Sequence, residues 1–260
     1  MKNIISLLLF LCSFELTFAQ NDGSSGKLIW ADEFNYSGPP DSTKWDYENG
    51  IVRNKEPQYY TKKRQENARV ENGNLVIEAK KEDYRGAEYT SASLITLGKM
   101  HLRYGRIEVR AKVPKGIGSW PAIWMLGVNR ELVKWPSCGE IDILEYIGRD
   151  STSAYGTVHF KNGVGKYEMS GQHPFVGKPY DDFHNYTFEW DKKKMTMSYD
   201  NIKYFEFNIA DADKNAQKIF SSKFYLLLNL ALGRVGTLGG RLDPDILPIT
   251  FLVDYVRIYK

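Results

Sequence analysis

Three carboxylates lie within six residues near the middle of the 260-residue chain: Glu140, Asp142 and Glu145. Isoleucine and leucine separate them, which is typical of a strand, and a strand alternates its faces, so Glu140 and Asp142 point the same way. Regular alternation would send Glu145 to the opposite face. One extra residue near Ile143 and Leu144, a β-bulge, would return it to the side of the other two acids. The sequence therefore predicts three acids on one face of a bulged strand.

Carboxylates grouped in this way suit the cleavage of a glycosidic bond. One ionised carboxylate attacks the sugar carbon, and a second, kept protonated, gives a proton to the leaving oxygen. An acid between them can hold the nucleophile and help to set its pKa. The alternative is a solvated edge strand whose charges face water, although like charges side by side destabilise a strand. We therefore predict that Glu140, Asp142 and Glu145 are catalytic.

The composition favours strands and turns over helices. Aromatic residues make up 14% of the chain, with 17 Tyr, 13 Phe and 6 Trp, and there are 22 Gly. The formal net charge is only +3, and Lys and Arg are scattered without a run, so nothing indicates a nucleic-acid partner. The length suits one domain, which we expect to span residues 27–260.

Short strands with regular turns indicate an antiparallel sandwich. The clearest hairpin joins residues 68–71 to residues 74–80 through the Asn72-Gly73 turn. A short helix is expected over residues 212–219. Further strands are expected at residues 27–34, 89–97, 103–113, 120–126, 155–160, 186–190, 194–199, 203–207, 224–231 and 251–259.

The N-terminus has the features of a targeting segment. Residues 1–19 combine a short basic start, an apolar run too short to span a membrane and a small-residue cleavage site, so we expect a signal peptide, followed by a flexible leader over residues 20–26. Export would place the protein in the periplasm, at the cell surface or outside the cell. Cys12 raises lipoprotein anchoring as an alternative, which Leu11 before it disfavours. Once the segment is removed, Cys138 is the single remaining thiol, so no internal disulfide can form.

The segment Trp120-Pro121-Ala122-Ile123-Trp124, followed by the acidic strand, resembles glycoside hydrolase family 16 and, within it, bacterial laminarinases. The resemblance extends from Asp32-Glu33-Phe34 to residues 253–259. It implies an all-β jelly-roll, a sandwich of two curved antiparallel sheets with an open concave cleft. It also implies an endo-acting β-glucanase that cleaves β-1,3-containing glucans, laminarin-type or mixed-linkage, by double displacement with retention. Glu140 would be the nucleophile, Glu145 the general acid/base and Asp142 the assisting carboxylate.

Five further residues are candidates for substrate binding. Trp120, Trp124 and Trp135 could pack in the core, but sugar rings stack on indoles and all three precede the catalytic strand. His159 alone would suit a structural role, yet the resemblance places the histidine of such a Thr-Val-His segment near the acids. The resemblance also implies that Asn54 lies in a loop that contacts sugar.

The resemblance implies a structural calcium on the convex face and no cofactor for catalysis. Its ligands would be Glu33, the backbone carbonyl of Gly73, and Asp254. The alternative is that Glu33 and Asp254 are ordinary surface acids. The expected partner is a β-glucan polysaccharide or oligosaccharide, and we expect a monomer.

Two departures from the laminarinase pattern affect the substrate. Ser93 stands where laminarinases often carry an arginine, and Leu238 where they often carry a tryptophan, which leaves mixed-linkage glucan open. Three rivals share the sandwich: a non-catalytic glucan-binding module, a transglycosylase of the same family, and another hydrolase of the family that acts on galactans. A polysaccharide lyase is disfavoured because no Tyr/His/Arg constellation stands out.

Overall fold

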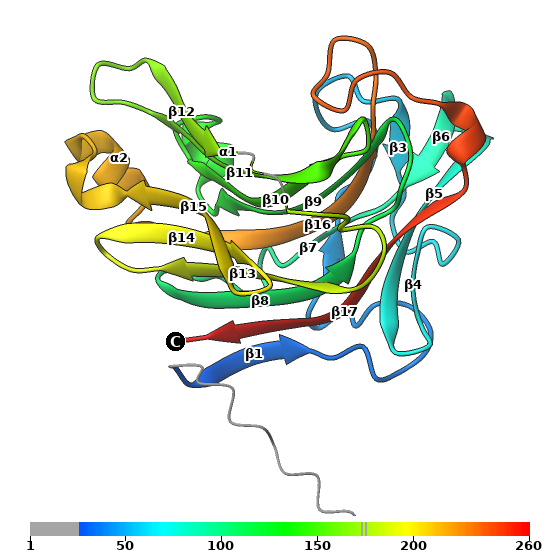
Figure 1. Cartoon of the computed structure of the whole chain (residues 1–260), viewed down its shortest axis with the longest axis horizontal. Helices are drawn as coiled ribbons and strands as arrows, with labels where there is room; N and C mark the ends of the chain where they lie inside the picture. Colours follow the sequence, from blue (N-terminus) through cyan, green and yellow to red (C-terminus); the bar gives the residue numbers. More distant parts are fainter. Residues whose placement is uncertain (1–25, 173, 175) are drawn as a thin grey trace, which may run out of the picture.

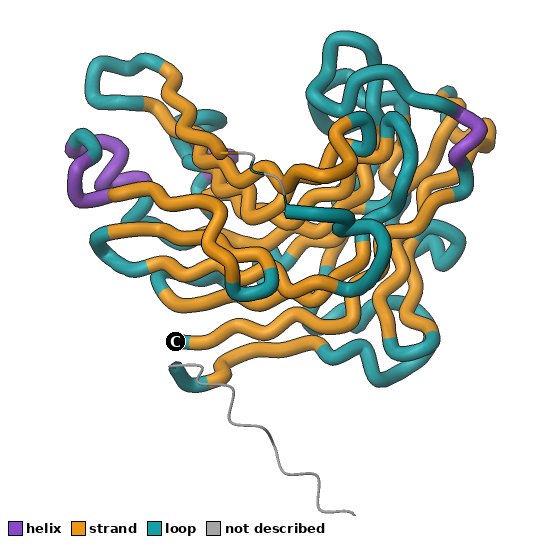
Figure 2. Tube along the Cα trace, viewed as in Figure 1, coloured by secondary structure: helices purple, strands orange, loops and turns teal. Residues whose placement is uncertain are grey.

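The structure is a computed structural model that describes residues 26–172, 174 and 176–260 (Figure 1). The predicted signal peptide, residues 1–19, and all but the last residue of the predicted leader, residues 20–26, lie outside the described residues. Two β-sheets pack face to face, and Figure 2 shows the helices as short pieces at their margins. This is the all-β sandwich that the sequence predicts.

The larger sheet has ten strands in the order β15-β14-β13-β8-β17-β5-β6-β3, with β1 added on β17 and β4 on β5. Its bounds are β1 Leu28–Asp32, β3 Gln58–Tyr60, β4 Ala68–Glu71, β5 Asn74–Tyr84, β6 Ala87–Ser91, β8 Gly105–Lys112, β13 His184–Trp190, β14 Lys194–Tyr199, β15 Ile202–Asn208 and β17 Ile249–Tyr259. Its pairs are antiparallel except that β3 pairs with β6 in parallel, which the prediction of purely antiparallel sheets did not include.

The smaller sheet has seven strands in the order β12-β11-β10-β9-β16-β7-β2. Its bounds are β2 Asp46–Tyr47, β7 Ser93–Ile95, β9 Ser119–Gly127, β10 Glu140–Ile147, β11 Asp150–Lys161, β12 Tyr167–Gln172 and β16 Phe224–Leu232. The helical pieces are α1 Arg130–Val133, η1 Ile209–Asp211, α2 Lys214–Ile219 and η2 Pro244–Ile246. Figure 1 shows the β11–β12 hairpin and the loop after β16 rising on opposite sides of this sheet.

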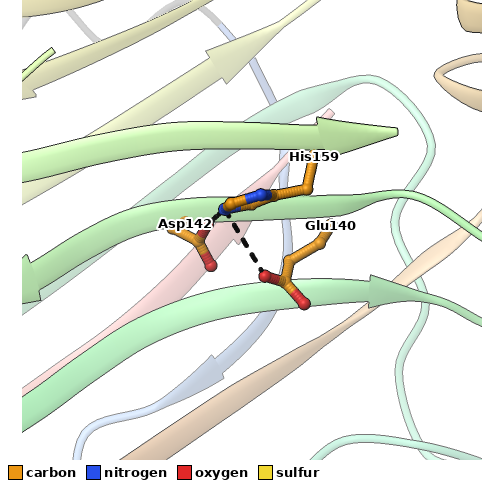
Figure 3. Close-up of side chains that lie close together, drawn as sticks. All are labelled: Glu140, Asp142 and His159. Atoms are coloured by element: carbon orange, nitrogen blue, oxygen red, sulfur yellow. Dashed lines mark ion pairs between the residues drawn. The ribbon is translucent and has the colours of Figure 1, made fainter. Parts of the chain in front are cut away.

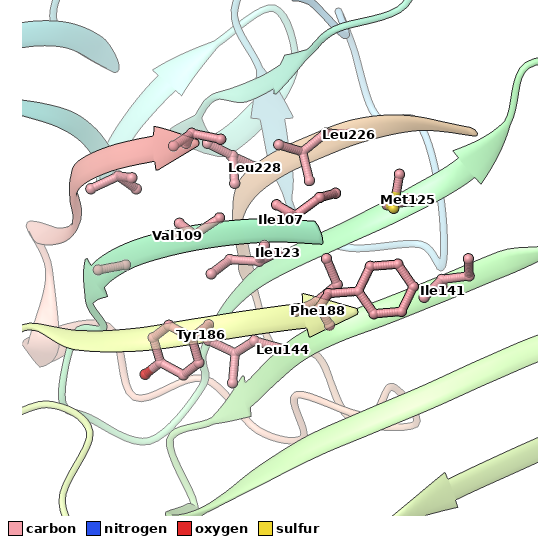
Figure 4. Packing of buried hydrophobic residues seen from close by; sticks show 14 of the residues in the cluster. Ile107, Val109, Ile123, Met125, Ile141, Leu144, Tyr186, Phe188, Leu226 and Leu228 are labelled. Carbon is pink, nitrogen blue, oxygen red and sulfur yellow. The ribbon is translucent and has the colours of Figure 1, made fainter. Parts of the chain in front are cut away.

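The core lies between the two sheets (Figure 4). Alternate residues of each central strand contribute to it, so the two layers bury apolar side chains against each other. Ile123 and Met125 of β9 and Ile141 of β10 meet Val109 of β8 and Phe188 of β13, and all of them are 1% exposed or less. The opposite face of β9 and β10 is left free of the core, and that face carries the acids.

Local predictions from the sequence hold at one turn and one helix, and they omit three strands: β2, β3 and β12. The residues between β4 and β5, Asn72 and Gly73, both have positive φ (53° and 74°), as a type I′ turn requires. Helix α2 begins after Asp213, whose carboxylate accepts from the backbone N–H groups of Asn215 and Ala216. Strands β2 and β3 have only two and three residues, too few to show a pattern, and β12 alternates only over Tyr167-Glu168-Met169-Ser170 before Gly171. Among the described residues, no helix is long and apolar enough to cross a membrane.

Candidate active site

The bulge predicted in the acidic strand is present in β10. Asp142 pairs with Trp124 of β9 and Leu144 pairs with Ile123, so Ile143 is the extra residue on β10. Both Ile143 and Leu144 are fully buried in the core, and Glu145 then returns to the face of Glu140 and Asp142. One inserted residue therefore places the three acids together.

A hydrogen bond from the opposite sheet fixes this bulge. The hydroxyl of Tyr204 on β15 donates to the carbonyl oxygen of Ile143. A bulged residue has no regular ladder partner, and a buried carbonyl without one is costly. Tyr204 is itself 6% exposed, so the contact is shielded from water and holds the backbone between Asp142 and Glu145.

His159 of β11 lies beside two of the acids (Figure 3). Its Nε2 is 3.1 Å from Oδ2 of Asp142 and 3.7 Å from Oε1 of Glu140. Its Nδ1 lies 2.6 Å from the hydroxyl of Tyr167 on β12, and the two rings are stacked 5.8 Å apart. The β11–β12 hairpin thus orients an imidazole towards the acids.

Glu145 has a different partner from the other two acids. Its Oε1 accepts a hydrogen bond of 3.0 Å from the indole N–H of Trp120. Trp120 is 7% exposed and lies on β9, the strand directly paired with β10. The sequence predicts that Trp120 stacks on sugar, and the structure adds a direct contact between Trp120 and an acid.

A cleft of about 280 Å³ opens over the acids. It is lined by Arg53, Asn54, Glu56, Trp120, Ala122, Trp124, Leu126, Arg130, Trp135, Glu140, Asp142, Glu145, Asn229 and Ala231. The structure thus brings Asn54 and the three predicted tryptophans to one cleft with the acids. Trp124 is only 6% exposed, whereas Trp135 is 49% exposed and offers an open ring.

Burial raises the pKa of all three acids. The pKa of Glu140 rises from 4.5 to about 8 through burial and the charge of Asp142, opposed by His159. Burial alone raises the pKa of Asp142 from 3.8 to about 8. The pKa of Glu145 rises from 4.5 to about 8 through burial and Asp142, opposed by the Trp120 N–H. The site therefore holds protons at neutral pH that exposed carboxylates would release.

Two further charges act on the glutamates in different directions. The positive charge of Arg53 lowers the pKa of Glu140, whereas the negative charge of Glu56 raises the pKa of Glu145. Both contributions are small beside burial and Asp142, so the pKa of each glutamate stays at about 8. The two acids titrate together, so that one ionises while the other keeps its proton.

Four polar residues of the cleft wall were not predicted from the sequence: Arg53, Glu56, Arg130 and Asn229. Asn229 of β16 accepts from the indole N–H of Trp124 at 2.7 Å and donates to the hydroxyl of Tyr60 at 2.9 Å. That hydroxyl in turn donates to Glu56 at 3.1 Å. Glu56 also accepts from Asn54 at 3.1 Å. No local sequence signal marks such a network, because its members come from separate strands and a loop.

The predicted calcium ligands are engaged by arginines. Both carboxylate oxygens of Glu33 accept from Arg257 at 2.8 Å, and Oδ2 of Asp254 accepts from Arg110 at 2.6 Å. Calcium binds oxygen ligands, so these carboxylates would have to leave their arginines to bind the ion. Gly73 is in the turn between β4 and β5. The calcium site stays a prediction.

Ligand-type atoms of Glu140, Asp142 and His159 lie within 4.8 Å of one another. Such a set could hold a divalent cation, but an ion on Glu140 would occupy the oxygen lone pairs that attack on a sugar carbon needs. We therefore assign these residues to acid chemistry.

A two-sheet sandwich whose cleft holds one buried and two half-buried carboxyls beside tryptophans is the arrangement of a glycoside hydrolase. The sequence matches the family model of Glycosyl hydrolases family 16 over residues 55–227, and the chain belongs to this family. The resemblance inferred from the sequence is thereby confirmed.

Individual relatives agree with the family assignment. The chain is 43% identical over 246 residues to a beta-glucanase of Rhodothermus marinus, covering 90% of this chain and 85% of the relative. It is similar, at 40% identity and a TM-score of 0.82, to a mutant of SCLam, a non-specific endo-beta-1,3(4)-glucanase co-crystallized with 1,3-beta-D-cellobiosyl-cellobiose, covering 91% of this chain and 95% of that one. It is also 36% identical over 241 residues to a keratan-sulfate endo-1,4-beta-galactosidase of Sphingobacterium multivorum, covering 90% of this chain and 55% of the relative.

The structure accounts for one of the two departures from the laminarinase pattern. The hydroxyl of Ser93 donates to Oε2 of Glu48 at 2.6 Å, and the same oxygen forms an ion pair with Arg53. The guanidinium of Arg53 therefore lies close to Ser93, although Arg53 belongs to another segment, the one before β3. Leu238 is in the loop after β16 and is 38% exposed, outside the residues that line the cleft.

Proposed function

We propose that this protein is an endo-acting β-glucanase that hydrolyses β-1,3-containing glucans, laminarin-type or mixed-linkage, with retention of anomeric configuration. One observation carries the proposal: the bulge at Ile143 brings Glu140 and Glu145 to one face inside a cleft, where burial and Asp142 raise the pKa of both to about 8. Double displacement needs this pair, an ionised carboxylate and a protonated one beside the same bond. The activities named for the relatives support β-glucan as the substrate.

The first step forms a glycosyl-enzyme intermediate. The Glu140 carboxylate attacks the anomeric carbon while Glu145 delivers its proton to the glycosidic oxygen, so the leaving sugar departs with a free hydroxyl. In the second step the ionised Glu145 takes a proton from water, and the hydroxide oxygen displaces Glu140 from the anomeric carbon. Asp142 and His159 lie beside the nucleophile, with Oδ2 and Nε2 3.1 Å apart, and the imidazole stabilises negative charge on the neighbouring acids.

The decisive experiment compares the parent with Glu140→Gln on laminarin, barley mixed-linkage glucan, lichenan and agarose. We expect the parent to release reducing sugar from the β-1,3-containing glucans. The variant should lose roughly 10⁴-fold or more in kcat because the shape is kept but the nucleophilic charge is lost. NMR of the first product should show the β-anomer. Equal rates for parent and variant would disprove the assignment of Glu140.

A galactan-active hydrolase is the second candidate, because the chain is also similar to a keratan-sulfate endo-1,4-beta-galactosidase. Release from agarose alone would favour it over a β-glucanase. Tight glucan binding without release would favour a binding module. Transfer of the glycosyl group to an added sugar acceptor, faster than hydrolysis, would favour a transglycosylase.

We further propose that the protein is exported, on the basis of the signal-like residues 1–19. Detection of a mature N-terminus near Gln20 outside the cytoplasm would support this, and an intact N-terminus in the cytoplasm would contradict it. The calcium prediction requires Arg257 to release Glu33. It predicts a higher Tm in calcium than in a chelator, and equal Tm values would remove it. Size-exclusion chromatography with light scattering tests the expected monomer.

A further inference from the structure

Arg53 is a buried cation in the cleft wall that the mechanism above uses only through its field. It lies in the segment between β2 and β3, and its side chain is 16% exposed. It lines the same cleft as the three acids. The two residues that follow, Asn54 and Lys55, have φ values of 52° and 55°, a region that non-glycine residues seldom occupy. Strained backbone of this kind is concentrated where a side chain must be aimed.

Three contacts fix the guanidinium of Arg53. It forms an ion pair with Glu48, whose backbone N–H donates to the carbonyl of Ser93 at 3.0 Å and whose Oε2 accepts from the Ser93 hydroxyl at 2.6 Å. Its central carbon lies 4.7 Å from the ring centre of Trp124 and 5.7 Å from that of Tyr60. The side chain is thus held by Glu48, by β3 and by β9 before any ligand arrives.

One donor nitrogen of this fixed group is left over. Nη1 of Arg53 is buried and has no hydrogen-bond partner among the described residues. Leaving a buried charged donor unpaired costs free energy, so a ligand oxygen that accepts from Nη1 should contribute favourably to binding. A guanidinium presents its donors in a rigid plane, which suits sugar hydroxyl oxygens.

The charges around Arg53 favour a neutral ligand. Glu48 already balances the guanidinium. The rest of the cleft wall carries one further cation, Arg130, against four carboxyl groups: Glu56, Glu140, Asp142 and Glu145. The nucleophile among these carboxyls must ionise to act, so a sulfate ester or a uronate would enter against its negative charge, whereas a hydroxyl would not.

We infer that Arg53 is a specificity-determining residue, which donates from Nη1 to hydroxyl oxygens of a neutral sugar unit on the Trp124 side of the acids. Glu48 and Ser93 position it. The inference rests on the proposed function, because the sugar is a unit of the glucan that the acids cleave. It also gives Ser93 a role: the serine leaves room for, and anchors, a guanidinium supplied by another segment.

The test uses the parent, Arg53→Lys and Arg53→Met, with Arg103→Lys and Arg103→Met as controls. Arg103 is exposed and does not line the cleft, and its guanidinium lies 5.7 Å from the ring centre of Tyr104. It therefore resembles Arg53 in having an aromatic neighbour but has no contact with the site. Both Arg53 variants should lose about 10- to 100-fold in kcat/KM on laminarin, mainly through KM, because a hydrogen bond to a charged donor is lost. The Arg103 variants should keep parent values.

The pH profile separates binding from a merely structural role. Arg53 lowers the pKa of Glu140, so Arg53→Met should move the acid limb of kcat/KM to higher pH, whereas Arg53→Lys keeps the charge and should move it less. The other titratable groups that act on or face Glu140 are unchanged in both variants: Asp142, Glu145, His159, Tyr167 and Cys138.

Calorimetry with laminarihexaose in the Glu140→Gln background measures binding without turnover. Arg53→Lys and Arg53→Met should bind at least about 10-fold more weakly than Glu140→Gln alone. Unchanged binding and unchanged kcat/KM would overturn the inference, as would equal losses in the Arg103 variants. If Arg53→Met fails to fold, the test is made on Arg53→Lys alone, after its Tm has shown that this variant is folded.

The failures of the two proposals are distinguishable. A parent that neither hydrolyses nor binds any glucan removes the proposed function. An active parent with unaffected Arg53 variants removes only the role of Arg53. Tighter binding of keratan sulfate than of its desulfated form, abolished by Arg53→Met, would overturn the neutral-sugar assignment in favour of an anionic one.

Discussion

Carboxylates on the two sheets have different partners, and their pKa values are shifted in opposite directions. On β5 of the ten-stranded sheet, Glu82 accepts from Arg64 at 2.6 and 2.9 Å. Together with Thr90, this arginine lowers the pKa of Glu82 from 4.5 to about 2. On β10 of the seven-stranded sheet, Asp142 and Glu145 are buried without an arginine paired to either, and the pKa of each is raised to about 8. The first arrangement holds a charge in place, and the second stores a proton for transfer.

The contrast separates structural acids from chemical ones by their surroundings. An arginine that pairs with a carboxylate in two places keeps it ionised and takes up its lone pairs. A carboxyl that must donate a proton near neutral pH needs the reverse, burial beside another acid. Three predictions, in order of decreasing expected effect, test whether the acids of the two sheets differ in catalysis and in stability.

Glu145→Gln should have the largest effect. Without the general acid, kcat on laminarin should fall by roughly 10²–10⁴-fold. An aryl glycoside whose leaving group needs no proton should lose much less. In the parent, Glu145 acts while protonated, so kcat/KM should fall as pH rises through about 8, and the variant should lose this limb. Glu82→Gln is the matched control and should keep the parent profile. A basic limb that survives in Glu145→Gln would contradict the assignment.

Tyr204→Phe should have an intermediate effect because it removes the donor to the bulge carbonyl of Ile143. We expect a loss of about 1–3 kcal/mol in the free energy of unfolding, measured by urea denaturation. A shifted Glu145 should lower kcat roughly 10-fold. The control is Tyr186→Phe on β13, since the Tyr186 hydroxyl has no hydrogen-bond partner among the described residues. Equal effects of the two variants would show that the bulge does not depend on Tyr204.

Asp142→Asn and Glu82→Gln should change stability with opposite dependence on pH. Between pH 3.8 and about 8 the folded parent binds more protons at Asp142 than the unfolded chain, so this acid destabilises the fold increasingly as pH rises. At Glu82 the unfolded chain binds more between about 2 and 4.5, so its contribution is full above pH 4.5 and is lost towards pH 2.

Thermal unfolding at several pH values checks both signs. Relative to the parent, Asp142→Asn should gain at least about 1 kcal/mol, roughly 2–4 °C in Tm, between pH 4 and pH 8. Glu82 is partly exposed, so Glu82→Gln should lose only about 0.5–1 kcal/mol at pH 7, and this loss should disappear near pH 2. Parallel pH dependence in the two variants would refute the comparison.

Much of this arrangement follows from the sequence because alternation along a strand is a local property. The face of Glu140 and Asp142 could be read directly, and the bulge followed from the need to bring Glu145 round to them. The segment 194–199 has the predicted bounds, and the hairpin at Asn72-Gly73 has the predicted turn. In these segments each residue and its neighbours in sequence decide the outcome.

The remaining features depend on contacts between distant segments. Tyr204 reaches Ile143 across 61 positions, and Trp124 meets Asn229 across 105. Arg53 directly precedes Asn54, which the resemblance places in a sugar-contacting loop, but its own place in the cleft follows from Glu48 and Trp124. Strand β12 is mostly exposed and alternates over only four residues, so its place in the sheet is fixed by pairing with β11. No local pattern specifies such pairs.

The single extra residue in β10 has a genetic consequence. Removing the codon for Ile143 would restore a regular strand without disturbing the reading frame. Glu145 would then follow Leu144 in plain alternation and stay on the face of Glu140 and Asp142, with Tyr146 still in the core. The spacing of the acids and the bulge therefore depend on each other: six residues need the extra residue and five would not, and a library of point substitutions would not reveal that dependence.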